Sequence, residues 1–395
     1  MNSIIPDKTP IAELPMAKSG DKIVLVGAIP PPITGQSVAF SMLIAGLRDR
    51  FPLHVHDISG KVGRRDKSFT LLRAWEVVRS ALGIYFHARR AKLLYLTIAQ
   101  SRWGFLRDAL IILLGRLAGA PVVIHLHGGN YKGYYHKETW LLRRVISFVL
   151  RRVERFVVLS DSLRDQFSFL GEATAARVAV IPNGCPIQFG TPRAAPQGRL
   201  HLLYLSNLLV QKGYLDIIDA MVHLQRLATG IDLRLTIAGT PMLGEDDYND
   251  VKAMATALRN HIRYNGLEDI VEVLPSVRRV MKERLFIDSD VAVLPTYYVN
   301  EGQPLAVIEA MARGMPVITT NWRSLGEMMV DGVNGVVVPP RSPLAIAHAA
   351  VRFTDPDFYE SVSRNAVETA RTFSVTAHVD RMAELFASIA HPPAA

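Results

Sequence analysis

The sequence contains a single cysteine, Cys185, so it cannot form an internal disulfide. A metal site built on several thiolate ligands is excluded for the same reason, and a reducing compartment is the expected setting. The sequence also lacks an unbroken apolar run of the roughly 18 residues that a membrane span needs. The most apolar stretch, residues 109–126, is interrupted by Arg116 and Pro121. We therefore expect a cytoplasmic protein without a spanning helix.

The first twenty residues also lack the features of a secretory signal. They carry Asp7, Glu13 and three prolines, and they contain no long apolar core. We interpret residues 1–20 as a flexible leader.

Acidic residues are scarce in the first half of the chain. Residues 1–195 hold 27 Lys and Arg against 13 Asp and Glu, a balance of +14, whereas the remainder has a balance of −5. A basic half indicates an anionic partner, such as a membrane surface, a lipid phosphate or a nucleic acid. Because the aromatic residues that single-strand binding requires are sparse, we expect no nucleic-acid partner.

Three basic segments are candidates for contact with an anionic membrane. Residues 140–152 (WLLRRVISFVLRR) combine aromatic, aliphatic and arginine side chains, and residues 61–67 and 88–92 add charge. Such segments suit the headgroup region of an anionic leaflet. An ordinary helix that covers a sheet would account for most of the apolar residues in 140–152, but it would not explain the +14 balance.

Short apolar runs rich in Val, Ile and Leu alternate with longer amphipathic stretches, which is typical of parallel sheets covered on both faces. A Pro/Gly-rich linker at residues 190–198 divides two such series. The sequence thus predicts an α/β protein with two doubly wound, Rossmann-like domains, residues 21–190 and 199–371. The expected strands are Lys22–Gly27, Leu53–Ile58, Leu93–Leu96, Val122–Leu126, Arg155–Leu159, Arg199–Leu205, Leu233–Ala238, Val271–Leu274, Val291–Leu294, Pro316–Ile318 and Gly335–Val338, with helices at Ser37–Arg50 and Val375–Ile389.

The most informative segment is residues 300–320 (NEGQPLAVIEAMARGMPVITT). Seven residues separate Glu301 from Glu309, and a helical pattern runs from Leu305 to Gly314. A helix N-terminus can hold a diphosphate, and a glutamate in the first turns can accept hydrogen bonds from a ribose diol. Taken alone, the spacing of the two glutamates favours an ordinary capped helix with one exposed acid.

Two further candidates follow strands. Lys212 lies between a strand and a helix, where a lysine can neutralise a departing diphosphate, although most lysines are simply solvated. Gly35, in the loop GAIPPPITGQS of residues 27–37, would let the backbone approach a ligand. By itself, that loop favours a plain connection between a strand and a helix.

A histidine also closes one of the expected strands. His127 follows residues 122–126 and precedes two glycines, so it can hydrogen-bond a sugar hydroxyl. We expect His125 to be structural and to point away from His127. The turn at Asn183 and Gly184 is expected to line a cleft.

Taken together, these segments resemble the E-x7-E signature of the retaining GT-B glycosyltransferases of family 4. The similarity extends to DVAVLP at residues 290–295, LGEMMVDGVNGVVVPP at residues 325–340 and IPNG at residues 181–184. The resemblance implies that the two domains face each other across a cleft, with the acceptor on the N-terminal side and the donor on the C-terminal side. It also implies that the last segment, residues 372–395, crosses back toward the first domain.

The resemblance implies roles by position. Glu301 and His127 would lie near the sugar, Lys212 would face the diphosphate, and these three are the expected catalytic residues. Asn207 stands where the family commonly has arginine, so the clamp on the diphosphate would be weaker or another basic residue would complete it. Glu309 would hold the ribose. The expected donor-binding residues are Gly35, Asn207, Lys212, Gly302, Gln303, Leu305, Ala306 and Glu309.

Asp288-Ser289-Asp290 resembles the D-x-D metal motif of the other main glycosyltransferase fold, but it immediately precedes an apolar strand. We expect no metal and no cofactor, because the nucleotide sugar is a substrate. The resemblance implies a metal-independent hexosyltransferase that moves a sugar from a nucleoside-diphosphate donor to an acceptor hydroxyl with retention. A carbohydrate or lipid-linked acceptor of polysaccharide or oligosaccharide assembly, at the inner face of the membrane, is expected. A sugar-nucleotide epimerase and a non-catalytic nucleotide-sugar-binding subunit remain as alternatives.

Overall fold

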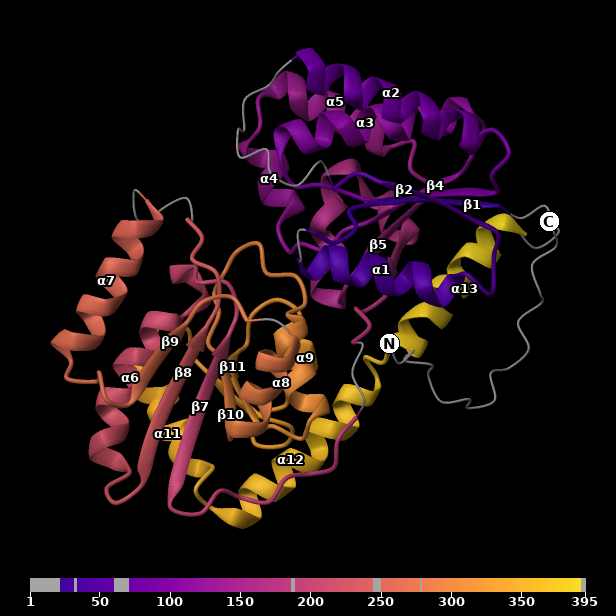
Figure 1. Ribbon diagram of the computed structural model, residues 1–395. Helices are drawn as coiled ribbons and strands as arrows, with labels where there is room; N and C mark the ends of the chain where they lie inside the picture. Colours follow the sequence, from indigo (N-terminus) through magenta and orange to yellow (C-terminus); the bar gives the residue numbers. More distant parts are fainter. Residues whose placement is uncertain are drawn as a thin grey trace.

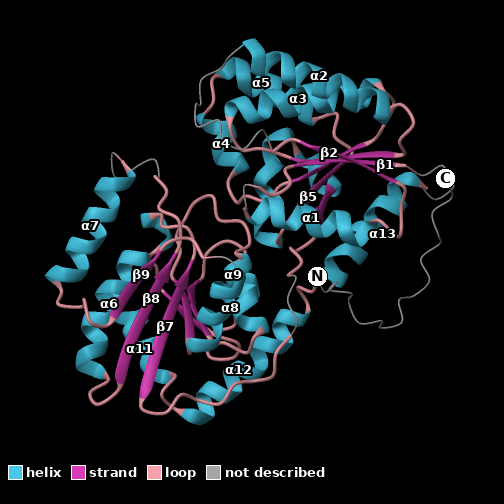
Figure 2. Cartoon of the chain, viewed as in Figure 1, coloured by secondary structure: helices cyan, strands magenta, loops and turns pink. Residues whose placement is uncertain are grey.

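The computed structural model describes residues 22–31, 34–59, 71–185, 189–243, 250–277 and 279–391. It contains two α/β domains, each built on a six-stranded parallel sheet with helices on both faces (Figure 1; Figure 2). This architecture confirms the predicted fold class. The leader at residues 1–20 and the basic cluster at residues 61–67 lie outside the described residues.

The N-terminal sheet has the strand order β2-β1-β3-β4-β5-β6. Helices α2, α3 and α5 cover one of its faces, and α1 covers the other. The strands are β1 (Ile23–Gly27), β2 (Leu53–Asp57), β3 (Leu93–Thr97), β4 (Val122–His125), β5 (Arg155–Val158) and β6 (Val178–Val180). The helices are α1 (Gly35–Leu47), α2 (Leu71–Ala88), α3 (Arg102–Leu117), α4 (Tyr131–Lys137) and α5 (Trp140–Leu150), followed by the 3-10 segments η1 (Asp161–Leu170) and η2 (Glu172–Arg177).

The C-terminal sheet has the strand order β12-β11-β10-β7-β8-β9. Its strands are β7 (Arg199–Leu205), β8 (Asp232–Ala238), β9 (Val271–Leu274), β10 (Val291–Leu294), β11 (Val317–Thr320) and β12 (Val336–Val338). The helical elements are η3 (Val210–Lys212), α6 (Tyr214–Leu227), α7 (Val251–Tyr264), α8 (Arg279–Asp288), α9 (Leu305–Ala312), α10 (Leu325–Met328), α11 (Pro343–Arg352) and α12 (Pro356–Arg371).

Continuous apolar runs produce the central strands. Every residue of β1 and β3 is buried, as a parallel sheet with helices on both faces requires. Side chains of the loops then set the helix starts. Thr34 and Ser37 form a reciprocal capping box at α1, and Ser374 caps the last helix by accepting a hydrogen bond from Ala377 N at 3.1 Å.

The segment between the two sheets is extended but firmly attached. Residues 189–198 form no helix or strand, and Arg193 donates to the carbonyl oxygens of Phe286, Ser289 and Arg313 at 2.7 to 2.9 Å. These bonds fasten the connection to the C-terminal domain.

The sequence pattern overlooked β6, whose three residues are too few to show a periodicity. It also placed the first helix two residues late, since α1 begins at Gly35, and it continued β4 through Leu126. Helix ends and strand ends vary by a residue or two because hydrogen bonding frays there. No helix among the described residues combines the length and the apolar content that crossing a bilayer requires.

The last helix, α13 (Val375–Ala390), leaves the C-terminal domain and packs beside α1 on the N-terminal sheet (Figure 1). Met382 and Phe386 are fully buried there, and the ring of Phe386 meets Tyr95 edge to face at 5.7 Å. The chain therefore completes its first domain with its last helix.

We predict that Phe386→Ala lowers the free energy of unfolding by about 3–5 kcal/mol, because it leaves a cavity between α13 and β3. Urea denaturation followed by circular dichroism measures the change. Glu384→Ala, an exposed position on the same helix, should stay within about 0.5 kcal/mol of the parent. Equal effects of the two substitutions would contradict this packing.

Candidate active site

The candidate site lies where the carboxyl ends of the two sheets meet. The loop between β10 and α9 carries Glu301, and the loop between β4 and α4 faces it. Gly129 N donates to Asn300 O across the domains at 3.0 Å. A Cβ on Gly129 would overlap the carbonyl of Glu301, and a Cβ on Gly302 would overlap the carbonyl of His127. Both glycines are therefore needed for the two backbones to touch.

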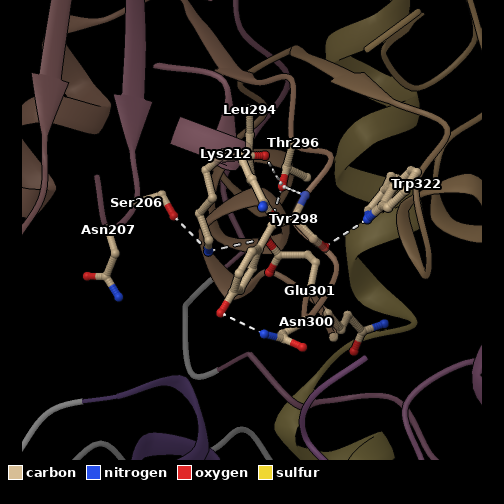
Figure 3. A network of polar contacts seen from close by, with 12 residues as sticks. Ser206, Asn207, Lys212, Leu294, Thr296, Tyr298, Asn300, Glu301 and Trp322 are labelled. Atoms are coloured by element: carbon tan, nitrogen blue, oxygen red, sulfur yellow. Dashed lines mark hydrogen bonds and ion pairs between the residues drawn. The ribbon is translucent and has the colours of Figure 1, made fainter. Parts of the chain in front are cut away.

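At the centre of the site, the Lys212 ammonium lies 3.2 Å from the Glu301 carboxylate (Figure 3). Ser206 Oγ accepts from Lys212 Nζ at 3.1 Å, and Thr296 Oγ1 donates to Glu301 Oε2 at 3.3 Å. The two charged side chains are only 12% and 8% exposed. Buried charges are tolerated when they are paired and hydrogen-bonded, and this pair meets both conditions.

The loop that carries Glu301 is fastened from behind. Trp322 Nε1 donates to Tyr298 O at 2.8 Å (Figure 3). Thr320 Oγ1 donates to Thr296 O. Arg323 donates to Val299 O at 3.3 Å and adopts a left-handed φ of 52°. A loop held at several points presents its carboxylate in a fixed position, which favours electrostatic preorganisation.

The second glutamate lies one turn inside α9, as the sequence pattern predicts. Its carboxylate forms an ion pair with Lys282 of α8. Lys282 was not predicted, because nothing in the local sequence indicates which residue faces Glu309. The first-turn amides of Leu305 and Ala306 have no acceptor within the helix, as at any helix start, and remain able to bind an anion.

Gln303 connects the site loop to the N-terminal domain. Its side-chain Oε1 accepts from Asn183 N at 2.6 Å, and Asn183 Nδ2 donates to the Gln303 carbonyl at 3.4 Å. We expected the turn at Asn183 and Gly184 to line a cleft. In the structure Asn183 contacts Gln303 of the loop that carries Glu301.

His127 lies in a cluster of buried histidines, and our prediction that His125 points away from it is wrong. The two rings are 4.0 Å apart, because residues two apart in a strand share a face. His125 is held by Tyr95 through an Nδ1–OH contact of 2.8 Å. Burial, together with nearby His378, lowers the pKa of His127 from 6.5 to about 3. His127 is therefore neutral near pH 7.

The structure also describes Gly35 and Asp290, two other residues singled out from the sequence. Gly35 is exposed at the start of α1, and a Cβ there would meet nothing within 4 Å, so packing does not require the glycine. Asp290 lies at the amino end of β10, where its carboxylate accepts from His201 N at 2.8 Å and pairs with Arg199 at 3.3 Å. Within the described ranges, no three His, Cys, Asp or Glu side chains are grouped as a metal site would require.

Comparison with known proteins places this geometry in a family. Residues 29–184 match the family model of the glycosyl transferase 4-like domain, and residues 191–369 match that of the glycosyl transferases group 1. The chain belongs to the group 1 glycosyltransferases. Its structure is similar to that of Anabaena HepE in complex with UDP-glucose, with a TM-score of 0.70 and 20% identity over 93% of this chain and 99% of HepE.

Two relatives illustrate the range of the family. Glycogen synthase of Mycobacterium tuberculosis is 30% identical over 250 residues, which are 61% of this chain but 56% of that protein. The α-D-kanosaminyltransferase of Streptomyces kanamyceticus is 26% identical over 298 residues, 70% of this chain and 73% of the relative. The chain thus matches little more than half the length of the glycogen synthase.

This group 1 glycosyltransferase also has an interdomain contact that its sequence did not reveal. The Glu327 carboxylate, on α10, accepts hydrogen bonds from the backbone N–H groups of Asp161 and Ser162, the first of them at 2.8 Å. These amides start η1 of the other domain, so Glu327 acts as a cap supplied from across the cleft.

Asn207 departs from the family pattern at the edge of the site. It is exposed beside Ser206 (Figure 3). Its backbone carbonyl accepts from Tyr204 OH at 2.9 Å. Its amide adds no positive charge. Lys212 therefore stands without the arginine that commonly accompanies it.

We predict that Asn207→Arg tightens the binding of a nucleoside diphosphate about tenfold, because a charge-assisted hydrogen bond to the diphosphate is added. Isothermal titration with UDP, GDP, ADP and TDP measures the affinity, and Asn207→Gln is the neutral control. Unchanged affinity in the arginine variant would show that this position does not face the diphosphate.

We also predict that His127 makes the fold sensitive to acid. Its pKa is about 3 in the folded chain against an ordinary 6.5, so the unfolded chain binds more protons between these values. The free energy of unfolding therefore falls as the pH drops below 6.5, with about 2 kcal/mol lost at about pH 5 through this residue.

Urea denaturation of the parent and of His127→Asn at several pH values tests this dependence. The variant should lose less stability than the parent on acidification, and the exposed His136→Asn should lose as much. A His127→Asn profile parallel to that of the parent would rule out the assignment.

Proposed function

We propose that this protein transfers a hexose from a nucleoside-diphosphate sugar to an acceptor hydroxyl with retention of the anomeric configuration. The main observation in support is the buried pair of Lys212 and Glu301, which lie 3.2 Å apart. The pair precedes the start of α9, and the loop that carries Glu301 touches the backbone of His127. Membership of the family supports the proposal, as does the likeness to HepE, which binds UDP-glucose.

The donor would bind mainly to the C-terminal domain. The amides of Gln303, Leu305 and Ala306 would hold the diphosphate together with Lys212. Glu309 would accept hydrogen bonds from the ribose hydroxyls, which then share its carboxylate with Lys282. This arrangement supplies positive charge from the protein itself, and we propose that the reaction needs no metal.

The chemistry follows from where charge develops. As the bond between the anomeric carbon and the phosphate oxygen breaks, negative charge collects on the diphosphate and positive charge on the sugar. Lys212 would stabilise the first and Glu301 the second. The acceptor oxygen would attack from the face that the diphosphate leaves, and its proton would pass to the departing phosphate oxygen. Neutral His127 would orient a sugar hydroxyl.

The acceptor would enter from the N-terminal domain. We propose a carbohydrate or lipid-linked acceptor in polysaccharide or oligosaccharide assembly at the inner face of an anionic membrane. The balance of +14 in residues 1–195 supports this location.

A thermal-shift screen against nucleoside diphosphates and their sugars identifies the donor, since a bound donor stabilises the fold by mass action. Transfer of labelled sugar from that donor is then measured. We predict that Glu301→Ala and Lys212→Ala each reduce transfer by about 10²-fold or more while circular dichroism remains that of the parent.

Matched controls are Glu272→Ala and Lys252→Ala, which remove the same charges from exposed positions and should leave turnover unchanged. If Glu301→Ala destabilises the fold, Glu301→Gln serves as a second variant, because it removes the charge and keeps the shape of the side chain. Near-normal turnover in either site variant would contradict the assignment, and release of an epimer without any acceptor would favour an epimerase.

A further inference from the structure

Three of the four tryptophans of this protein are exposed. Trp75, Trp103 and Trp140 lie on α2, α3 and α5, and each is at least 60% exposed. The fourth, Trp322, is tied into the site loop through its bond to Tyr298. Tryptophan rings are among the most apolar surfaces that a side chain offers and are highly buried on average. Exposure on three separate helices therefore calls for a physical explanation.

The three helices form one layer. Their inner sides belong to a single core cluster against the N-terminal sheet, with Ile84, Phe105 and Ile146 fully buried. Figure 1 shows α2, α3 and α5 side by side, on the opposite side of that sheet from α1 and α13 and away from the C-terminal domain. The three tryptophans thus belong to one outer helical face.

The outer helical face has an apolar stripe of its own. On α2, Trp75, Val78, Leu82 and Phe86 follow each other at helical spacing and are 39% to 65% exposed. The outward side of a helix that covers a sheet is normally polar. All large hydrophobic side chains that are exposed among the described residues before position 186 lie on these three helices. The apolar exposure is therefore confined to one surface.

Positive charge accompanies the apolar surface. Residues 71–154 contain fourteen Lys and Arg against four Asp and Glu. Arg144 of α5 lies over the Trp140 ring at 5.3 Å, and Arg152, two residues beyond the end of α5, lies over the Phe148 ring at 3.5 Å. A hollow of about 570 Å³ beside α5 is lined by these residues together with Arg143 and Arg151. Guanidinium groups beside aromatic rings suit lipid phosphates above the acyl chains.

We propose that the outer helical face of α2, α3 and α5 docks on an anionic lipid bilayer. This inference deepens the proposed function by naming the surface that meets the membrane. The aromatic and aliphatic side chains insert at the level of the headgroups, and the arginines bind lipid phosphates. None of the described helices spans the bilayer in this arrangement.

The positive charge of this face favours an anionic bilayer over two other binding partners, a second copy of the chain and a nucleic acid. A second copy bound through the same face would set arginine against arginine, because a two-fold interface pairs identical patches. A nucleic acid would neutralise the arginines but leave the apolar stripe of α2 in water. An anionic bilayer covers both.

The docked face also connects directly to the site. The chain runs from Gly129, at the domain contact, through α4 to Trp140. In this arrangement the N-terminal domain meets the membrane, and the C-terminal domain, which lies away from the outer helical face, remains in water (Figure 1).

Vesicle flotation of the full-length protein tests the inference. Vesicles of phosphatidylcholine with phosphatidylglycerol are compared with vesicles of phosphatidylcholine alone, in about 0.1 M and about 1 M salt. The parent should float with the anionic vesicles at low salt, and less at high salt. Its tryptophan emission should shift to the blue and be quenched by brominated lipid.

Two triple variants separate the charge from the apolar surface. Arg143→Gln with Arg144→Gln and Arg151→Gln should lower partitioning about 100-fold, since each arginine contributes about 1 kcal/mol near an anionic surface. Trp75→Ser with Phe86→Ser and Trp140→Ser should lower partitioning at least as much. Partitioning of this variant should remain low even at low salt. Tyr264→Ser with Val280→Ser and Ile287→Ser, at positions of the C-terminal domain that are 71% to 89% exposed, should partition like the parent.

A parent that fails to float with anionic vesicles, or triple variants that float like the parent, would overturn the inference. A change from dimer to monomer in the tryptophan variant, seen by light scattering, would assign the face to a second copy instead. The quenching measurement uses the parent alone, so it decides the matter even where a variant does not fold. Flotation requires no sugar transfer, and thus a failure of the proposed chemistry leaves this result unaffected.

Discussion

The structure depends above all on one buried ion pair, between Lys212 and Glu301. Two charges removed from water are stable only when each finds the other and a hydrogen bond besides, and Ser206 and Thr296 supply those bonds. The pairing requires the turn after β7 to lie beside the loop after β10. The sheet provides this by placing β10 next to β7, with Val291 opposite Leu202. From β7 the strand order runs one way to β9 and the other way to β12, so the pair lies at the switch point where such sheets bind ligands.

The contacts described between the two domains each involve backbone atoms of at least one domain. Gly129 and Gly302 bring the two site loops into contact, and the glutamine and glutamate side chains of Gln303 and Glu327 bind amides of the opposite domain. Glycine is required because any Cβ at those points would collide with a carbonyl oxygen. An active site shared by two domains can therefore form only when the backbones reach this separation, and α13 helps to set it by anchoring the end of the chain on the first domain.

Local patterns predicted the parts of this protein that depend on neighbouring residues. Continuous apolar runs gave the long strands, and the spacing of Glu301 and Glu309 located the loop and helix of the site. The partners that come from distant segments could not be predicted, because packing decides them. Lys282 reaches Glu309 only through the placement of α8, and Glu327 caps η1 only once the domains meet. The wrong prediction for His125 did not come from distant packing. Residues two apart in a strand share a face, so the strand period itself places His125 on the same side as His127.

The apolar residues of the arginine-rich helix α5 lie on two surfaces, one packed against the sheet and one exposed. Part of its apolar sequence packs against the sheet, where Ile146 and Val149 are fully buried. Trp140 and Phe148 are not, and arginines lie over both rings. The same division extends to the whole molecule, because the first half has a balance of +14 and the second of −5. A negatively charged bilayer would attract the first domain and repel the second. In the proposed docking the C-terminal domain would stay in water, and a diphosphate ligand would be drawn by the local charge of Lys212 rather than by the net charge of the domain.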